Sequence, residues 1–257
     1  MFYFIFFIDK YFFYKYALNN KKEVKNSFLD ELFNFTTYAQ LYEDLILFCV
    51  FYDVKSEDGF YIDIGANDPT QNSVTKAFYL RGWHGINMEP WPLKFELLSK
   101  ERTRDINLQM GAGKEEGNFT FYEKGDLSTL KTDLKRMGST EMTITVNTVS
   151  NICKKYVPKG TIIQFCKIDV EGGEQDVLLG YDFENYRPKV FCIEATKPST
   201  KIPTHDQWEY ILTNHSYSFV FQHDVNRFYV DDKIEGLRER FNKVKKIIKF
   251  YKYLNRY

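Results

Sequence analysis

Strand-like and helix-like patterns alternate along the chain from residue 60 onward. Short apolar runs rich in aromatic and β-branched residues predict buried strands, and apolar residues three and four apart predict the helices between them. The predicted strands are 60–65, 85–90, 106–113, 161–172, 189–195, 217–222 and 226–232. The predicted helices are 73–82, 93–102, 173–181 and 205–215. Between the third and fourth strands, 118–130 and 142–148 have extended patterns with hairpin character.

This alternation predicts an α/β fold with one mostly parallel, seven-stranded sheet and helices on both faces, because the strands are almost continuously apolar. The last two predicted strands, 217–222 and 226–232, are separated by only three residues. Parallel neighbours need a crossover of about a dozen residues, so these two strands are antiparallel if they pair. A terminal antiparallel hairpin is unlike a plain dinucleotide-binding fold and is typical of the Rossmann-like methyltransferase sheet.

The two ends of the chain differ from this central part. Residues 2–8 are seven apolar residues, and Asp9 and Lys10 follow them. This run is too short for a membrane span and has no small-residue cleavage site, so a packed or interfacial segment is expected. We divide the chain into an aromatic and helical extension, a central α/β domain and a basic C-terminal helix, at 1–37, 38–232 and 233–257.

The C-terminal helix is amphipathic and basic. Residues 233–257 contain nine Lys and Arg against two acidic residues, and apolar residues recur at helical spacing at Leu237, Phe241, Val244, Ile248 and Tyr251. Two interpretations are open: the apolar face packs on its own domain or on a second subunit, or the helix binds an anionic membrane surface or an acidic partner.

Composition and charge exclude some functions and leave others open. The 257 residues carry zero formal net charge, which gives no electrostatic argument for nucleic-acid binding. Four cysteines lie far apart, without ligand spacing, at Cys49, Cys153, Cys166 and Cys192. They favour a reduced, cytoplasmic setting. Peripheral contact with the inner membrane through 233–257 is an additional expectation.

The end of the first predicted strand carries the chemistry of a cofactor site. In open α/β sheets, ligands bind at the carboxyl ends of the strands. Gly65 and Asn67 form the turn there, and Glu89 ends the second strand, where a carboxylate grips ribose hydroxyls. A GxGxxG loop for a pyrophosphate is absent, and Asp63 and Asp68 would repel phosphates. The acidic turn favours S-adenosylmethionine, which carries adenosine at one end and positive charge at the other.

Several blocks of the sequence together resemble one protein family. They are AQLYEDLI (39–46), SVTKAFYLRGWHGINMEP (73–90), DLSTL (126–130), KIDVEGGEQDVLLG (167–180), RPKVFCIEAT (187–196) and NRFYV (226–230). In this order they resemble FkbM-type S-adenosylmethionine-dependent methyltransferases over roughly 38–232. Alanine is usual in the family where Gly173 stands. The resemblance implies the class I methyltransferase fold and methyl transfer to oxygen, often on a sugar hydroxyl.

The resemblance also implies residues and a substrate class. Cofactor-binding positions carry over to Asp63, Gly65, Asn67 and Glu89, with Ser73 as a weaker addition, and we add Gly111 at the end of the third strand. The acceptor implied is a nucleotide-activated sugar or a cell-surface glycan precursor of the capsular polysaccharide or lipopolysaccharide type. We expect the insertion 114–150 to contact the acceptor.

A sugar hydroxyl is a poor nucleophile, so a base or a metal ion must help to remove its proton. Asp169 and Glu194 end the fourth and fifth strands, and two alternatives are open. Asp169 acts alone as the base, or Asp169 and Glu194 hold a divalent cation such as Mg²⁺ or Mn²⁺. His205 and His223 are candidates for either role. We assign Asp169, Glu194 and His205 to catalysis, and Asp169, Glu194 and His223 to the metal site. Glu171 and Glu174 are interpreted as helix-capping residues.

Three other functions compete with methyl transfer. An NAD-dependent sugar oxidoreductase requires a GxGxxG loop, which is absent. The Tyr-xxx-Lys pair of its short-chain form occurs at Tyr11 and Lys15, upstream of the first strand and so in the wrong place. A nucleic-acid methyltransferase would want a basic face and an Asn/Asp-Pro-Pro motif, which are absent. A non-catalytic assembly module that uses 233–257 for interaction stays compatible with the sequence.

Overall fold

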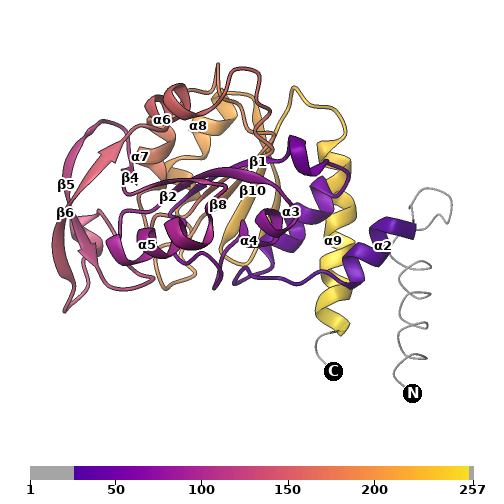
Figure 1. Ribbon diagram of the computed structural model, residues 1–257, viewed down its shortest axis with the longest axis horizontal. Coiled ribbons are helices and arrows are strands. Elements are labelled where there is room, and N and C mark those ends of the chain that lie inside the picture. Colours follow the sequence, from indigo (N-terminus) through magenta and orange to yellow (C-terminus); the bar gives the residue numbers. More distant parts are fainter. Residues whose placement is uncertain (1–25, 255–257) are drawn as a thin grey trace.

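The computed structural model describes residues 26–254 and consists of two β-sheets with helices around them (Figure 1). The large sheet has the order β3-β2-β1-β7-β8-β10-β9, and the small sheet has the order β4-β6-β5. The large sheet contains β1 (Phe60–Ile64), β2 (His84–Met88), β3 (Ile106–Leu108), β7 (Phe165–Ile168), β8 (Val190–Glu194), β9 (Tyr217–His223) and β10 (Asn226–Asp231). The small sheet contains β4 (Gly111–Ala112), β5 (Gly117–Glu123) and β6 (Thr140–Asn147).

The strand directions confirm the predicted fold class. The pairs from β3 through β2, β1 and β7 to β8 are all parallel. Strand β10 runs antiparallel to both β8 and β9, so the sheet ends in the predicted hairpin. The extended interlude is also a hairpin, in which β5 pairs antiparallel with β6.

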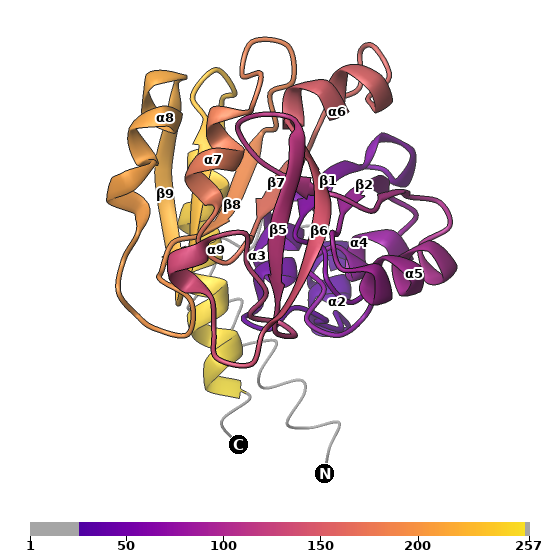
Figure 2. The ribbon, with the colours of Figure 1, turned by 90° about the vertical axis from the view of Figure 1, so that its left-hand side faces the viewer.

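One predicted strand, 106–113, is divided between the two sheets. Residues 106–108 pair with β2, and Gly111 and Ala112 pair with β6 instead. A Cβ on Gly111 would come within 3.2–3.3 Å of side-chain atoms of Ile144, Leu130 and Val146. The missing side chain therefore lets the chain approach the small sheet closely, and the small sheet lies across the carboxyl end of the large one (Figure 2).

Helices cover both faces of the large sheet, as predicted. One face packs against α2 (Asn26–Phe33), α3 (Glu43–Phe51), α4 (Lys76–Leu80) and α9 (Leu237–Leu254). The other face packs against α6 (Val149–Tyr156), α7 (Glu174–Leu179) and α8 (Glu209–Asn214), while α5 (Pro92–Glu101) follows β2. Three short 3₁₀ turns complete the described chain: η1 (Ser56–Asp58), η2 (Thr132–Leu134) and η3 (His205–Gln207).

The C-terminal helix α9 packs its apolar face on its own domain. Leu237, Phe241, Val244 and Ile248 are buried in the same core as α3, and the side chain of Tyr251 lies outside the described residues. Arg240 donates hydrogen bonds from α9 to Asp53, at 2.7 and 2.8 Å. Between residues 26 and 254, no helix is long and apolar enough to cross a membrane. The aromatic segment 2–8 lies outside the described part.

Candidate active site

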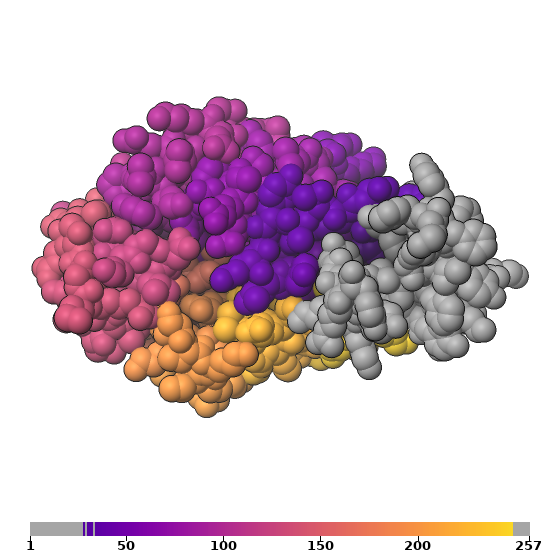
Figure 3. Space-filling view, turned by 90° about the horizontal axis from the view of Figure 1, so that it is seen from below, coloured from indigo at the N-terminus to yellow at the C-terminus, as the bar shows by residue number. Residues whose placement is uncertain are grey.

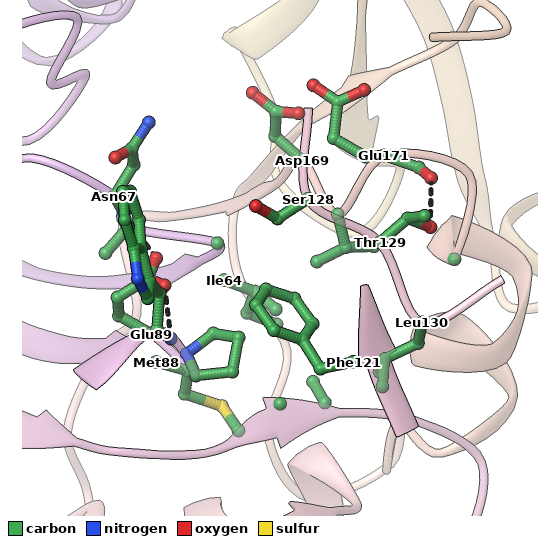
Figure 4. Close-up of a pocket in the computed structure, with 18 of the residues that line it drawn as sticks. Ile64, Asn67, Met88, Glu89, Phe121, Ser128, Thr129, Leu130, Asp169 and Glu171 are labelled. Atoms are coloured by element: carbon green, nitrogen blue, oxygen red, sulfur yellow. Dashed lines mark hydrogen bonds between the residues drawn. The ribbon is translucent and has the colours of Figure 1, made fainter. Parts of the chain in front are cut away.

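A cavity of about 320 Å³ lies at the carboxyl ends of β1, β2 and β7 and is closed on one side by the small sheet. Polar side chains stand at its two ends (Figure 4): Asn67 and Glu89 on one side, Asp169 and Glu171 on the other. Apolar side chains also line the cavity, among them Ile64, Met88, Phe121 and Leu130, which lie below Asp169 and Glu171 in this view. Seen from below, a hollow separates the small sheet from the indigo segment around α3 (Figure 3).

The backbone conformation of the turn after β1 requires glycine at residue 65 and favours asparagine at residue 67. Gly65 has φ +75°, and a Cβ there would lie 1.9 Å from the backbone oxygen of Asp169. Only glycine fits this position without moving one of the two strand ends. Asn67 has φ 51°, the left-handed conformation that asparagine tolerates better than most residues. The turn therefore packs directly on the end of β7.

Glu89 is held by this turn and faces the cavity. Its Oε2 accepts a hydrogen bond from the backbone N–H of Asn67 at 2.7 Å, and its Oε1 accepts one from that of Trp91 at 2.8 Å. Burial raises the pKa of this carboxyl group, and the two N–H donors oppose that rise. Each carboxylate oxygen keeps capacity for a second donor, so the pair can accept two hydroxyl groups of a ribose.

Two predicted cofactor residues lie behind the cavity wall, which corrects our expectation of direct contact. Asp63 is 1% exposed, accepts a hydrogen bond from Thr75 Oγ1 at 2.9 Å and lies 3.3 Å from Lys167 Nζ. Ser73 is buried and accepts a hydrogen bond from Arg102 at 3.4 Å. Both side chains support the wall from behind. The other predicted cofactor residues, Gly65, Asn67, Glu89 and Gly111, all line the cavity.

Three carboxyl groups gather at the opposite end of the site. Ligand atoms of Asp169, Glu171 and Glu194 lie within 4.8 Å of one another, and this is the group among residues 26–254 that could hold a metal ion. Burial and the Asp169 carboxylate raise the pKa of Glu194 to about 10, so Glu194 is protonated at neutral pH. Burial likewise raises the pKa of Glu171 to about 8, with Asp169 and Glu174 adding to the effect. The cluster therefore holds less negative charge than its three carboxyl groups suggest.

Glu171 and Glu174, both predicted to cap the following helix, have different roles in the structure. Glu174 does cap the loop, because its Oε1 accepts hydrogen bonds from the backbone N–H groups of Val170 and Gly172 at 3.2 and 3.1 Å. Glu171 instead adopts the left-handed conformation, with φ 53°, and lines the cavity beside Asp169. Its sequence context gives no signal for this, since the backbone conformation decides where its side chain points.

The structure brings neither predicted histidine to the cavity. His205 lies in η3, with its Nε2 3.4 Å from Asp206 Oδ1. His223 ends β9 and is separated from β8, which carries Glu194, by the intervening strand β10. Glu171 takes the third place in the carboxylate group that we expected His223 to fill. The predictions of His205 as a catalytic residue and His223 as a metal ligand therefore gain no support from the cavity lining or from the carboxylate group.

The loop 124–131 connects the two ends of the cavity. Asn67 donates a hydrogen bond from its side chain to Asp126 at 2.8 Å, and Thr129 Oγ1 donates one to the backbone oxygen of Glu171 at 2.8 Å. Phe121, Ser128 and Leu130, all in the insertion 114–150, line the cavity. Contact of this insertion with the acceptor stays a prediction. Upstream of β1, Glu43 also lines the cavity, and burial raises its pKa to about 7.

Comparison with known proteins gives one family match. A family model for the methyltransferase FkbM domain matches residues 63–219. Among curated proteins, no sequence matches significantly. A solved methyltransferase FkbM from Methylobacillus flagellatus is 18% identical with a TM-score of 0.45, and the match covers 68% of this chain and 44% of that one. A precorrin-6y C5,15-methyltransferase from Geobacter metallireducens is 12% identical with a TM-score of 0.40, covering 76% and 92%.

The family model accounts for more than half of the 257 residues and includes the turn after β1, Glu89 and the acidic end of β7. It confirms the resemblance found in the sequence blocks. The chain therefore belongs to the FkbM methyltransferase family.

Proposed function

We propose that this protein is an S-adenosylmethionine-dependent O-methyltransferase that acts on a sugar hydroxyl. The observation that carries the proposal is Glu89, whose two carboxylate oxygens accept hydrogen bonds from backbone N–H groups at the edge of the cavity. The turn beside it has the sequence GANDPT instead of GxGxxG. A carboxylate so placed suits ribose hydroxyls, and Phe121 and Leu130 offer an apolar surface for adenine. When bound, this cofactor supplies a sulfonium methyl group, whose transfer to a hydroxyl releases one proton.

Asp169 is the residue that we propose takes this proton. Its side chain is 41% exposed and faces the cavity at the end opposite Glu89. The raised pKa of Glu194 reduces the negative charge beside Asp169. The acceptor hydroxyl would lie between Asp169 and the cofactor end of the cavity, so that the base is within hydrogen-bond reach.

A divalent cation at this end is the alternative to Asp169 acting alone as the base. Asp169, Glu171 and Glu194 offer the hard oxygen ligands that Mg²⁺ or Mn²⁺ prefers. Bound there, the ion would polarise the acceptor oxygen and lower the pKa of its proton. Activity that survives exhaustive dialysis against EDTA would reject the ion, whereas loss of activity with recovery on adding Mg²⁺ or Mn²⁺ would support it.

For the acceptor, we propose a nucleotide-activated sugar or a cell-surface glycan precursor, handled in the cytoplasm next to the inner membrane. The family resemblance supports the sugar. The exposed side chains of Lys243, Lys245 and Lys246 on α9 support contact with anionic lipid. Sedimentation with vesicles containing anionic lipid, compared with neutral vesicles, tests the second part.

A titration followed by a substrate screen tests the function itself. Calorimetry should detect tight binding of S-adenosylhomocysteine and none of NAD. Binding of NAD alone would point to an oxidoreductase, and binding of neither would favour a non-catalytic module. A panel of sugar nucleotides incubated with methyl-labelled cofactor should then identify an acceptor, and label in nucleic acid would contradict the sugar assignment.

A further inference from the structure

Lys167 is a buried lysine whose side chain lines the cavity. It lies on β7, opposite Asp63 of β1 on one side and Cys192 of β8 on the other. Its side chain is 10% exposed. Its ammonium group contacts three oxygens: it donates a hydrogen bond to the backbone oxygen of Gly65, lies 3.3 Å from Asp63 Oδ1 and lies 3.7 Å from Asp169 Oδ2. Of these three contacts, the one with Gly65 is a hydrogen bond, and those with Asp63 and Asp169 are ion pairs.

These three contacts join the two ends of the site. Gly65 belongs to the turn that presents the backbone N–H of Asn67 to Glu89. Asp169 is the proposed base at the other end. Burial alone would favour a neutral amine, but the carboxylates of Asp63 and Asp169 reverse this and raise the pKa of Lys167, so that it keeps its charge.

The lysine is anchored to a network of buried polar groups. Thr75 Oγ1 donates a hydrogen bond to Asp63 at 2.9 Å, and Arg102 donates one to Thr75 Oγ1 at 3.0 Å. Arg102 is paired in turn with Asp105 at 3.0 Å, and both of these side chains are fully buried. Asp63 Oδ1 accepts no hydrogen bond, so the network reaches Lys167 through the ion pair between Asp63 and Lys167. Lys167 therefore has this buried polar network on one side and the turn after β1 and Asp169 on the other.

We propose that Lys167 is a positioning residue that sets the Asp169 carboxylate relative to the turn after β1. The proposal rests on the proposed function, because it assigns cofactor binding to one of these groups and proton removal to the other. Lysine suits the place because it is a compact point charge with three separate donors, whereas the planar fork of arginine requires more space.

The test compares Lys167→Met with the double variant Lys167→Met/Asp63→Asn. The first removes the ammonium group and leaves Asp63 buried without its counter-charge, so it is expected to lower the melting temperature. The second restores the charge balance and should recover most of that loss. If Lys167 positions Asp169, both variants should lose about 100-fold in kcat, because a displacement of about 1 Å costs that much. Their affinity for S-adenosylhomocysteine should stay within about tenfold, since Glu89 is untouched.

A double variant that regains kcat to within threefold of the wild type would overturn the proposal, because Lys167 would then only balance the charge of Asp63. Hydrogen exchange gives a readout that does not depend on the reaction. The backbone amides of Gly65 and Ala66 should exchange faster in both variants than in the wild type. Unchanged exchange would overturn the proposal that Lys167 holds Asp169 and the turn after β1 together. Failure of the proposed function shows itself separately, as wild-type protein that binds no S-adenosylhomocysteine.

Discussion

The Oε2 atom of Glu89 lies 2.7 Å from the backbone nitrogen of Asn67, although 22 residues separate the two in sequence. This bond joins the end of β2 to the turn after β1, so a change in either element alters the other. The same Asn67 reaches the loop 124–131 through Asp126 at 2.8 Å. The turn, the carboxylate and the loop thus form one side of the cavity.

Replacing Glu89 with glutamine should weaken the binding of S-adenosylhomocysteine by about 10- to 100-fold. The amide has one acceptor atom, so its NH₂ group must face either the N–H of Asn67 or that of Trp91, where two donors oppose each other. Calorimetric titration measures the change. Glu116→Gln is the matched control, since that side chain is exposed and does not line the cavity. Equal affinities for the two variants would remove Glu89 from the cofactor site.

Replacing Asp169 with asparagine should lower kcat by about 10³-fold, the usual contribution of a general base. The amide keeps the size of the side chain but cannot accept the proton of the acceptor. Affinity for S-adenosylhomocysteine should change only a few-fold, because Glu89 and the turn are intact. Asp206→Asn serves as the control, since that side chain is 88% exposed and outside the cavity. Unchanged turnover in Asp169→Asn would exclude Asp169 as the base.

The sequence predicts most of the large sheet because the strands are specified by patterns of neighbouring residues. Apolar runs identify each strand, and three residues between the last two strands suffice to establish their antiparallel pairing. Strand ends also locate Gly65, Asn67, Glu89 and Asp169, all of which line the cavity. A pattern that is read along the chain therefore finds residues whose role follows from their position on a strand.

The remainder depends on contacts between distant residues. Asp63 looks like a cavity residue from its place at a strand end, but its partners Thr75 and Lys167 come from other elements and hold it behind the wall. His223 does not line the cavity, and β10 lies between its strand and β8, which carries Glu194. Phe121 lines the site because the small sheet lies over it, and no local pattern predicts that arrangement.

Glu43 should make stability fall as the pH rises from about 4.5 to about 7. Burial raises its folded pKa from 4.5 to about 7, so the folded state binds the proton more tightly than the unfolded chain does. Its contribution is present below pH 4.5, is lost through this window at up to about 1.4 kcal/mol per pH unit, and is constant above it. Glu43→Gln has no proton to lose, so its free energy of unfolding relative to the wild type should increase between pH 5 and 7. Denaturant titrations at both pH values check this, with Glu116→Gln as an exposed control that should show no such change.

Alanine substitutions at two glycines separate the cost of a left-handed backbone from the cost of a steric clash in the site. Gly65 and Gly160 both have positive φ, at +75° and +87°, but a Cβ would lie 1.9 Å from the Asp169 oxygen at Gly65 and meets nothing within 4 Å at Gly160. Gly160→Ala should therefore cost only the left-handed conformation, about 1–2 kcal/mol, and leave cofactor binding unchanged.

Gly65→Ala adds the collision, so the ends of β1 and β7 must separate. We expect a loss of stability larger than that of Gly160→Ala by about 1–3 kcal/mol, as in overpacked sites. The turn also positions the backbone N–H of Asn67, which donates a hydrogen bond to Glu89. In Gly65→Ala, affinity for S-adenosylhomocysteine should therefore fall at least about tenfold. Denaturant titration and calorimetry on the two variants measure both effects. Similar losses in both, with cofactor affinity intact, would mean that the contact between Gly65 and Asp169 does not hold the site together.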